Sequence, residues 1–118
     1  MSLTKSDILK ADDLKMEEVE IPEWNGSVFV TELTGDARDE FEQYLAQLEE
    51  KRQEGNFMHL RAALAAATIV DEKKERMFTF NEIKQLGKKN GKALDRIFEA
   101  ANKLNKVFGT ERDSVEKN

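Results

Sequence analysis

The sequence predicts an α+β fold that is mainly α-helical, with four to five helices and one N-terminal β-hairpin. Three observations support this prediction. Near the N-terminus, alternating apolar and acidic residues flank a turn-forming segment, which is the pattern of a hairpin. Most of the remaining chain repeats its apolar residues with helical spacing. The 118 residues contain one proline and no cysteine, and this length suits a single domain with its own core.

The N-terminal part predicts a short helix followed by the hairpin. Thr4–Asp7 has the form of a capping box, which should open the helix. The strands are expected around Val19–Ile21 and Val28–Val30. Between them, Pro22 should end the ladder, and Asn25-Gly26 should supply the positive φ angles of a tight turn. Because an isolated hairpin is marginal in water, it should pack on the helices or on another chain.

Two longer helices should follow the hairpin. The first is expected to be capped by Thr34 or Asp36 and to run to about Gln53. Its apolar stripe comprises Phe41, Tyr44, Leu45 and Leu48. After Glu54-Gly55-Asn56, the second is expected to start with Asn56 as its cap and to extend to Val70. Its small residues between positions 62 and 67 allow a neighbouring helix to approach closely, so this should be the buried central helix.

The C-terminal third predicts a polar turn, a short helix and a long helix. Asp71–Arg76 should form the turn, and Met77-Phe78 a short extended piece. Thr79–Glu82 is a second capping box and should open a helix of about two turns. Gly87–Gly91 breaks that helix, and Gly109 should end the last one. The stripe of this last helix comprises Leu94, Ile97, Phe98, Ala101, Leu104 and Phe108.

Charge is divided unevenly along the chain. Residues 1–72 hold 17 acidic and 7 basic side chains, whereas residues 73–106 hold 4 acidic and 10 basic ones. The two parts could attract each other within one chain or head-to-tail between copies, so a homo-oligomer is one expected partner. We expect residues 1–109 to form the domain and residues 110–118 to form a polar C-terminal tail.

No motif predicts catalysis, a cofactor or a metal. Asp71–Glu82 has the twelve-residue span of an EF-hand loop, but Lys73 occupies its third position and Arg76 replaces the glycine that the sharp turn needs. His59 is the only histidine, and one imidazole without cysteines does not build a zinc site. The sequence therefore predicts a protein that is not an enzyme, with no catalytic, cofactor-binding or metal-binding residues.

Nucleic acid and membrane are disfavoured as partners. Residues 79–86 and 92–108 could form a basic segment resembling a helix-turn-helix, which keeps a small DNA-binding regulator as an alternative. The chain as a whole carries a net charge of −5, which opposes binding to a polyanion. No apolar run approaches the roughly 18 residues that a membrane span needs.

Taken in order, these pieces resemble the tail assembly chaperones of long-tailed (siphovirus-type) bacteriophages and prophages. The resemblance extends over nearly the whole chain. The residues that carry it are Leu3–Leu9, Ala11–Leu14, Val19–Val30, Arg61–Leu64, Ile69–Asp71, Met77–Ile83, Leu86–Ile97 and Ala101–Asn105. Residues 71–78 depart from the family, because they are rich in Lys and Glu where an Asp/Gly-rich turn is expected.

The resemblance implies a non-catalytic chaperone that binds the tape measure protein and assists assembly of the tail tube. Its partners would be the tape measure protein, the tail tube protein and other copies of this chain. It would act in the host cell cytoplasm and be absent from the mature virion. A structural tail or head-tail completion protein is a further alternative, and such a protein would remain in the particle.

The expected partner-binding residues are Trp24, Phe29, Phe57, Met58 and Phe98. Trp24 should lie at the hairpin tip, where it could either contact a partner or fold back onto the helices as a core plug. Phe98 belongs to the stripe of the last helix, which also suits a place in the core. Phe57 and Met58 stand at a helix start, and either environment suits them.

Overall fold

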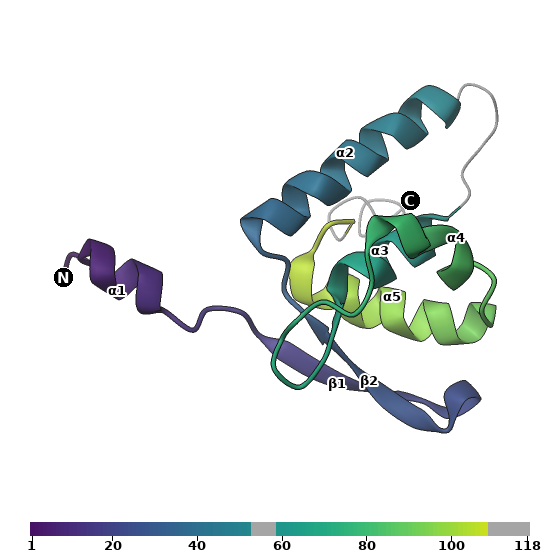
Figure 1. The fold of residues 1–118 in the computed structure, drawn as a ribbon, viewed down its shortest axis with the longest axis horizontal. Coiled ribbons are helices and arrows are strands. Elements are labelled where there is room, and N and C mark those ends of the chain that lie inside the picture. Colours follow the sequence, from purple (N-terminus) through teal and green to yellow (C-terminus); the bar gives the residue numbers. More distant parts are fainter. Residues whose placement is uncertain (53–58, 109–118) are drawn as a thin grey trace, which may run out of the picture.

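A computed structural model describes residues 1–52 and 59–108 of this protein (Figure 1). Within these ranges it contains five α-helices, two short 3-10 turns and a three-stranded sheet, which confirms the α+β prediction. The elements are α1 (Lys5–Lys10), β1 (Met16–Ile21), η1 (Pro22–Trp24), β2 (Gly26–Thr31), α2 (Gly35–Arg52), α3 (Leu60–Thr68), β3 (Ile69–Val70), η2 (Phe80–Glu82), α4 (Ile83–Leu86) and α5 (Gly91–Asn105).

The predicted hairpin is present, but its turn differs from the expected one. Gly26 already pairs with Ile21 as the first residue of β2. The connection is a 3-10 turn that starts at Pro22 and ends at Asn25, which has a positive φ of 55°. Proline suits this place because its fixed φ fits the first position of a helical turn. Asn25 therefore supplies a positive φ as predicted, whereas the prediction that Gly26 also belongs to the turn was wrong.

A third strand, β3, joins the hairpin, so the sheet order is β1-β2-β3 with antiparallel pairing throughout. Ile69 pairs with Val30, and Val70 pairs with Phe29. The expectation that the central helix continues to Val70 was wrong, since α3 ends at Thr68. Ile and Val are β-branched and favour extended structure, and pairing with β2 satisfies their backbone groups.

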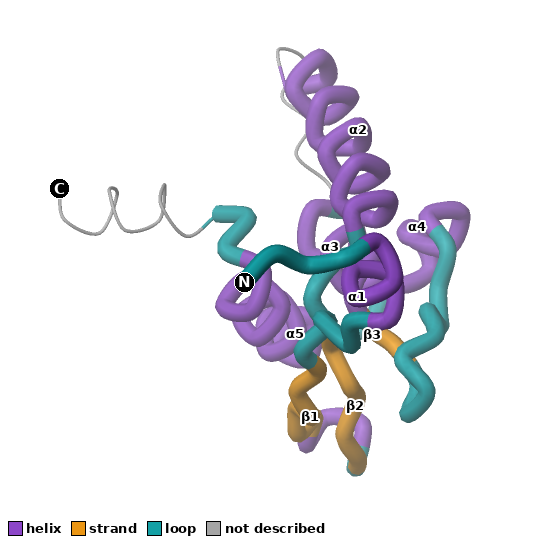
Figure 2. The backbone as a smooth tube through the Cα atoms, turned by 90° about the vertical axis from the view of Figure 1, so that its left-hand side faces the viewer, coloured by secondary structure: helices purple, strands orange, loops and turns teal. Residues whose placement is uncertain are grey.

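The core lies between α3, α5 and the inner face of the hairpin. All residues from Ala62 to Thr68 are buried, which confirms α3 as the central helix. Ile21 and Val30 face it from the sheet and are fully buried. The hairpin lies to one side of the helices and α2 extends away on the other (Figures 1 and 2). Helix α1 stands apart from the body (Figure 1).

Both predicted capping boxes form. At α1, the Thr4 hydroxyl accepts a hydrogen bond from Asp7 N at 3.1 Å, and the Asp7 carboxylate accepts one from Thr4 N at 2.9 Å. The hydrogen bond from the Thr4 backbone N–H to the carboxylate lowers the pKa of Asp7. At η2, the Glu82 carboxylate accepts a hydrogen bond from Thr79 N at 2.9 Å. This 3-10 turn then leads directly into α4.

The ends of the other helices partly follow the predictions. Of the two candidate caps for α2, Thr34 is used, because its hydroxyl accepts a hydrogen bond from Ala37 N at 3.0 Å. His59 stands at the N-cap position of α3, in place of Asn56, which lies outside the described residues. The last helix ends at Asn105, before the predicted stop at Gly109, because Lys106 adopts a left-handed φ of 54°.

The acidic and basic parts of the sequence meet within one chain. Among the described residues, three ion pairs join an acidic side chain of residues 1–72 to a basic side chain of residues 73–106. They are Arg96–Glu23 at 2.9 Å, Arg76–Glu40 at 2.8 Å and Lys74–Asp12 at 2.9 Å. The attraction that the sequence left open, within a chain or between chains, is therefore used at least in part to hold the hairpin, α2 and the N-terminal arm in place.

Candidate partner-binding surfaces

The hairpin tip is fastened to α5 by a two-bond ion pair. Arg96 donates from Nε to Glu23 at 2.9 Å and from a terminal nitrogen to the second carboxylate oxygen at 3.1 Å. This hydrogen bonding lowers the pKa of the Glu23 carboxyl. The neighbouring Trp24 is half-buried and packs against the core. Part of the indole therefore serves as a plug, and the rest remains accessible at the surface.

The lowered pKa of Glu23 predicts a pH dependence that the single tryptophan can report. A carboxyl with a depressed folded pKa stabilises the fold above its unfolded pKa, here 4.5, and this contribution is lost as the pH falls through the folded value. Acidification should therefore loosen the tip and shift Trp24 emission to longer wavelength while far-UV circular dichroism is unchanged. Glu23→Gln should show the shifted emission already at neutral pH.

The matched control for this prediction is Glu20→Gln. Glu20 is an exposed carboxylate on β1 that makes no ion pair with α5 among the described contacts. Its replacement should leave the emission unchanged, whereas Arg96→Gln should reproduce the effect of Glu23→Gln. If Glu23→Gln emits like the wild type at neutral pH, the ion pair does not hold the indole in place.

Phe98 belongs to an aromatic cluster at the C-terminal end of α5. Its ring stacks on Phe108 with centroids 5.6 Å apart and an interplanar angle of 20°. Phe108 in turn meets Phe41 of α2 edge-on, with centroids 6.3 Å apart. Phe98 is half-buried in this cluster, so part of its surface is used in packing. Phe98 does not line the groove at the sheet edge in which Phe29 lies.

Phe29 lines an open groove at the edge of the sheet, between β2 and the turn that follows β3. We refer to it as the β2–turn groove. It has a volume of about 510 Å³ and is lined by Ser27–Phe29, Val70–Lys73, Glu75 and Met77. Because β3 pairs only with Phe29 and Val30, residues 26–28 have no strand partner on this side within the described chain. The short third strand thus creates the groove.

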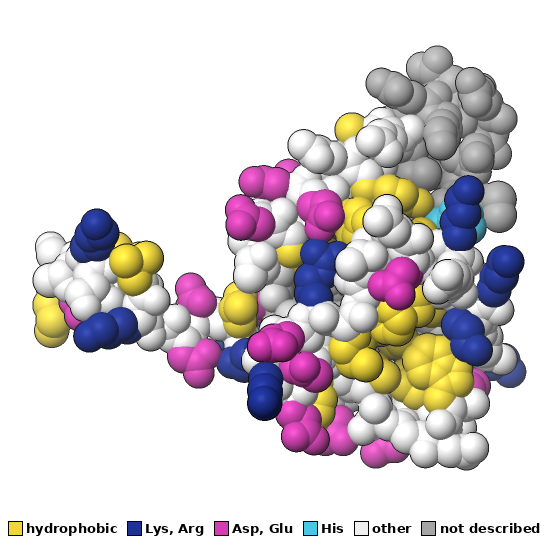
Figure 3. All heavy atoms as spheres, viewed as in Figure 1, with side chains coloured by type: hydrophobic (Ala, Val, Ile, Leu, Met, Phe, Trp, Pro, Cys, Tyr) yellow, Lys and Arg dark blue, Asp and Glu magenta, His cyan; other side chains and the backbone are white. Residues whose placement is uncertain are grey.

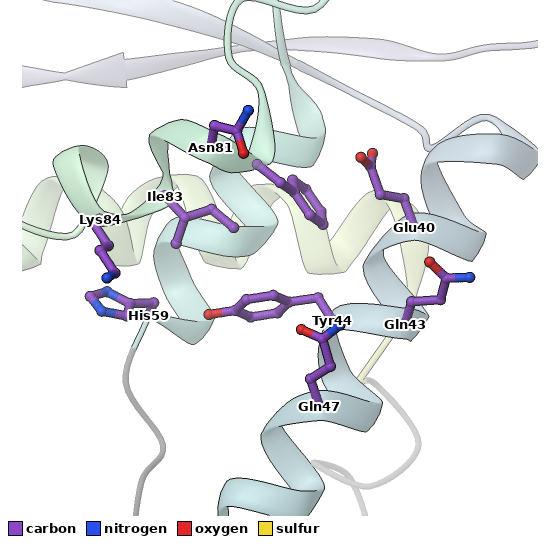
Figure 4. Close-up of a pocket in the computed structure, with 9 residues that line it drawn as sticks. Glu40, Gln43, Tyr44, Gln47, His59, Asn81, Ile83 and Lys84 are labelled. Carbon is purple, nitrogen blue, oxygen red and sulfur yellow. The ribbon is translucent and has the colours of Figure 1, made fainter.

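A second depression, the α2–α4 pocket, has an aromatic floor and a polar rim (Figure 4). Its volume is about 530 Å³. It is lined by Glu40, Gln43, Tyr44 and Gln47 from α2, by Phe80, Asn81, Ile83 and Lys84 from η2 and α4, and by His59. The Tyr44 ring reaches from α2 across the pocket towards Ile83 and His59, and it meets Phe80 edge-on at 5.8 Å. Burial raises the pKa of the Tyr44 phenol.

The sequence did not predict this pocket. Phe57 and Met58 lie outside the described residues, and they directly precede His59 in the sequence. Gly87 lets the end of α4 approach the His59 ring, because a Cβ atom at Gly87 would lie 2.9 Å from His59 Nδ1. The aromatic floor forms only because Tyr44 of α2 meets Phe80 of η2, and the sequence alone does not show that these two elements pack together.

The described residues offer no metal centre. Among them, no group of three or more His, Asp or Glu side chains is arranged to hold a metal ion. Within the EF-hand-like segment, the Asp71 carboxylate accepts hydrogen bonds from the backbone N–H groups of Lys73 and Glu75, at 2.8 and 3.0 Å. Glu82 is used in its capping box. These carboxylates therefore shape the turn and the helix start.

The basic segment is exposed, and it forms a short helical part over residues 80–86 followed by the long helix α5. Lys and Arg side chains gather at the edge where α4 meets α5 (Figure 3). However, α4 spans only Ile83–Leu86, and Arg96 of α5 is paired with Glu23. No helix in the described ranges has the length and apolar character needed to cross a bilayer.

Comparison with known proteins identifies the family. Residues 5–118 match the model of the phage tail assembly chaperone family. The fold is similar to the solved structure of the bacteriophage HK97 tail assembly chaperone, with a TM-score of 0.57, 20% sequence identity, and coverage of 84% of this chain and 90% of that one. Among curated proteins, no sequence matches. With a match over nearly its whole length, the chain belongs to the phage tail assembly chaperone family.

Proposed function

We propose that this protein binds the tape measure protein of its phage and assists assembly of the tail tube around it, without catalysing a reaction. The observation that carries this proposal is the family match over residues 5–118. The protein acts in the host cell cytoplasm, has the tail tube protein and further copies of itself as additional partners, and leaves the particle before it is complete.

The α2–α4 pocket suits an anchor side chain from a helical client. Helix-in-groove recognition inserts apolar residues from one helix face into an apolar groove with a polar rim. Here Tyr44 and Phe80 supply the apolar floor, and side chains such as Gln43 and Gln47 supply the rim. Aromatic residues in a partly desolvated pocket are the side chains that contribute most to such interfaces. We therefore assign the first client contact to this pocket.

Co-expression with the tape measure protein tests the function directly. The measurement is how much of that client stays soluble and co-purifies with this protein. We expect the tape measure protein to stay soluble in complex with this protein, because apolar helix faces of the client that the chaperone covers cannot associate with each other. If the client precipitates regardless and this protein purifies alone, the chaperone proposal fails. Absence of this protein from purified particles, checked by mass spectrometry, separates a chaperone from a structural completion protein.

Two substitutions on α2 test the pocket with a matched control. Gln47→Arg places a long charged side chain at the pocket mouth, whereas Ala46→Arg adds the same charge at an exposed position outside it. We expect Gln47→Arg to reduce the co-purified client by about tenfold or more, which corresponds to about 1.4 kcal/mol of binding free energy. Ala46→Arg should match the wild type. Equal losses in both variants would exclude the pocket, and Trp24→Ala then tests the hairpin tip.

A further inference from the structure

The α2–α4 pocket continues past His59 into a neighbouring depression, which we call the α3–α5 pocket. It has a volume of about 320 Å³ and is lined by His59–Ala62, Gly87, Lys89, Gly91 and Leu94. His59 lines both depressions, and Figure 4 shows the Lys84 side chain of the first one pointing towards the His59 ring. The two pockets are therefore adjacent. Together they form one track that follows the chain from Ile83 to Lys89.

The wall between the two pockets is held in one position. His59 has a left-handed φ of 75°, a backbone conformation that residues with a side chain seldom adopt. Its ring lies against Gly87, where a Cβ atom would come within 2.9 Å of Nδ1. Such backbone conformations persist only where the surrounding structure holds them, and they are frequent at ligand-binding sites. The track therefore has a fixed shape at its centre.

The α3–α5 pocket combines an apolar floor with a basic rim. Ala62 and Leu94 are buried, and they supply apolar surface at the bottom of the pocket. Arg61 and Lys89 are exposed at the rim. The α2–α4 pocket has the same plan, because its aromatic floor lies beside the exposed Lys84. Both ends of the track thus suit a partner that brings apolar side chains and negative charge.

Each pocket contains one lysine that no carboxylate neutralises within the described chain. These lysines are Lys84 and Lys89, and neither forms an ion pair with a described residue. The other Arg and Glu side chains that line the pockets are already paired. Their ion pairs are Glu40–Arg76 and Arg61–Asp95. Because Lys88 is exposed as well, the track offers unneutralised positive charge, and this edge of the molecule is basic in Figure 3.

We propose that the track binds an acidic amphipathic helix of the client. An apolar side chain of this helix occupies the α2–α4 pocket, and a carboxylate about four to seven positions away on the same helix face meets Lys84 and Lys89. The inference rests on the proposed function and adds to it the chemistry of the client segment. Apolar contacts in the groove supply affinity, and opposite charges at the rim fix the register of the helix. Apolar floors and a net charge of −5 make a nucleic acid a poorer fit.

Co-expression of the full chain with the tape measure protein tests the charged contact. Lys84→Gln and Lys89→Gln should each lower the amount of co-purified client by about two- to fivefold, the effect of an exposed ion pair. Lys84→Glu and Lys89→Glu should lower it by about tenfold or more, because each places a like charge against the carboxylate. Lys89→Arg keeps the charge and should bind as wild type. Both positions are exposed, so all these variants should fold.

The matched control is Lys103→Glu. Lys103 is exposed on α5 but lines neither pocket, so its replacement changes the net charge equally without touching the track. This variant should bind as much client as the wild type. Salt gives a second measurement, because an ionic strength of about 0.5 M screens exposed charges. It should release client from the wild type, whereas the Lys84→Gln/Lys89→Gln double variant should respond much less.

The outcomes separate this inference from the proposed function. If the wild type holds the client and the Lys84→Glu and Lys89→Glu chains lose no more of it than Lys103→Glu, the chaperone function stands and the acidic-helix contact is excluded. If the wild type itself holds no client, the proposed function fails and this inference fails with it. Displacement of bound client by duplex DNA at constant salt would assign the track to nucleic acid and would overturn the inference as well.

Discussion

Replacing Phe41 with alanine should lower the free energy of unfolding by about 3–5 kcal/mol, the largest effect that we expect from a single substitution. Phe41 is fully buried and heads the largest buried side chains of the described chain. Its ring is the link between α2 and the C-terminal aromatic cluster, through the edge-on contact with Phe108. Removing it forfeits the burial of the ring and leaves a cavity that rigid neighbours fill only in part.

Thermal denaturation followed by circular dichroism measures this effect, with a urea titration for the free energy. For a domain of this size, a loss of 3 kcal/mol or more should lower Tm by at least about 10 °C. Phe41→Leu is the control, because it keeps most of the apolar volume and should cost much less. If Phe41→Ala unfolds within a few degrees of the wild type, α2 is not joined to the core through this residue.

The local signals of the sequence were sufficient for most of the helices. Thr4 and Thr79 open capping boxes because hydroxyl and carboxylate groups at that spacing satisfy free N–H groups of the first turn, wherever the helix then packs. The small residues of α3 indicated its central place for a similar reason, since side-chain size alone limits how closely helices approach. These features depend on residues that lie close together in the chain, so the sequence alone is enough to predict them.

The features that sequence analysis missed depend on residues that are distant in the chain. Ile69 and Val70 continue the apolar character of α3, and only their pairing with β2 makes them a strand. The β2–turn groove is lined by residues about forty positions apart in the sequence. The sequence therefore indicated Phe29 as a partner-binding residue but did not indicate the groove around it. The α2–α4 pocket likewise depends on how Tyr44 meets Phe80. Propensity and spacing do not determine such tertiary contacts.

Asn105 is the polar counterpart of Phe41, and Asn105→Ala should cost about 2–3 kcal/mol. The Asn105 side chain accepts a hydrogen bond from Leu33 N at 2.7 Å and donates to the carbonyl oxygens of Thr31 and Ala101 at 3.3 and 2.9 Å. It thereby joins the last turn of α5 to the segment between β2 and α2. Alanine removes the acceptor of the partly buried Leu33 N–H, and a donor left without a partner costs about 1–3 kcal/mol when water cannot replace the lost bond.

Urea denaturation gives the free-energy loss, and amide hydrogen exchange shows where it arises. In Asn105→Ala, the Leu33 amide should exchange faster than in the wild type by a larger factor than the amides of α3, because its partner is removed directly. Lys103→Ala on the exposed face of the same helix is the control and should stay within about 0.5 kcal/mol of the wild type. If Asn105→Ala lowers the free energy of unfolding by no more than Lys103→Ala does, water replaces the hydrogen bonds that the Asn105 side chain makes. In that case the C-terminal end of α5 is held to the sheet by apolar packing alone.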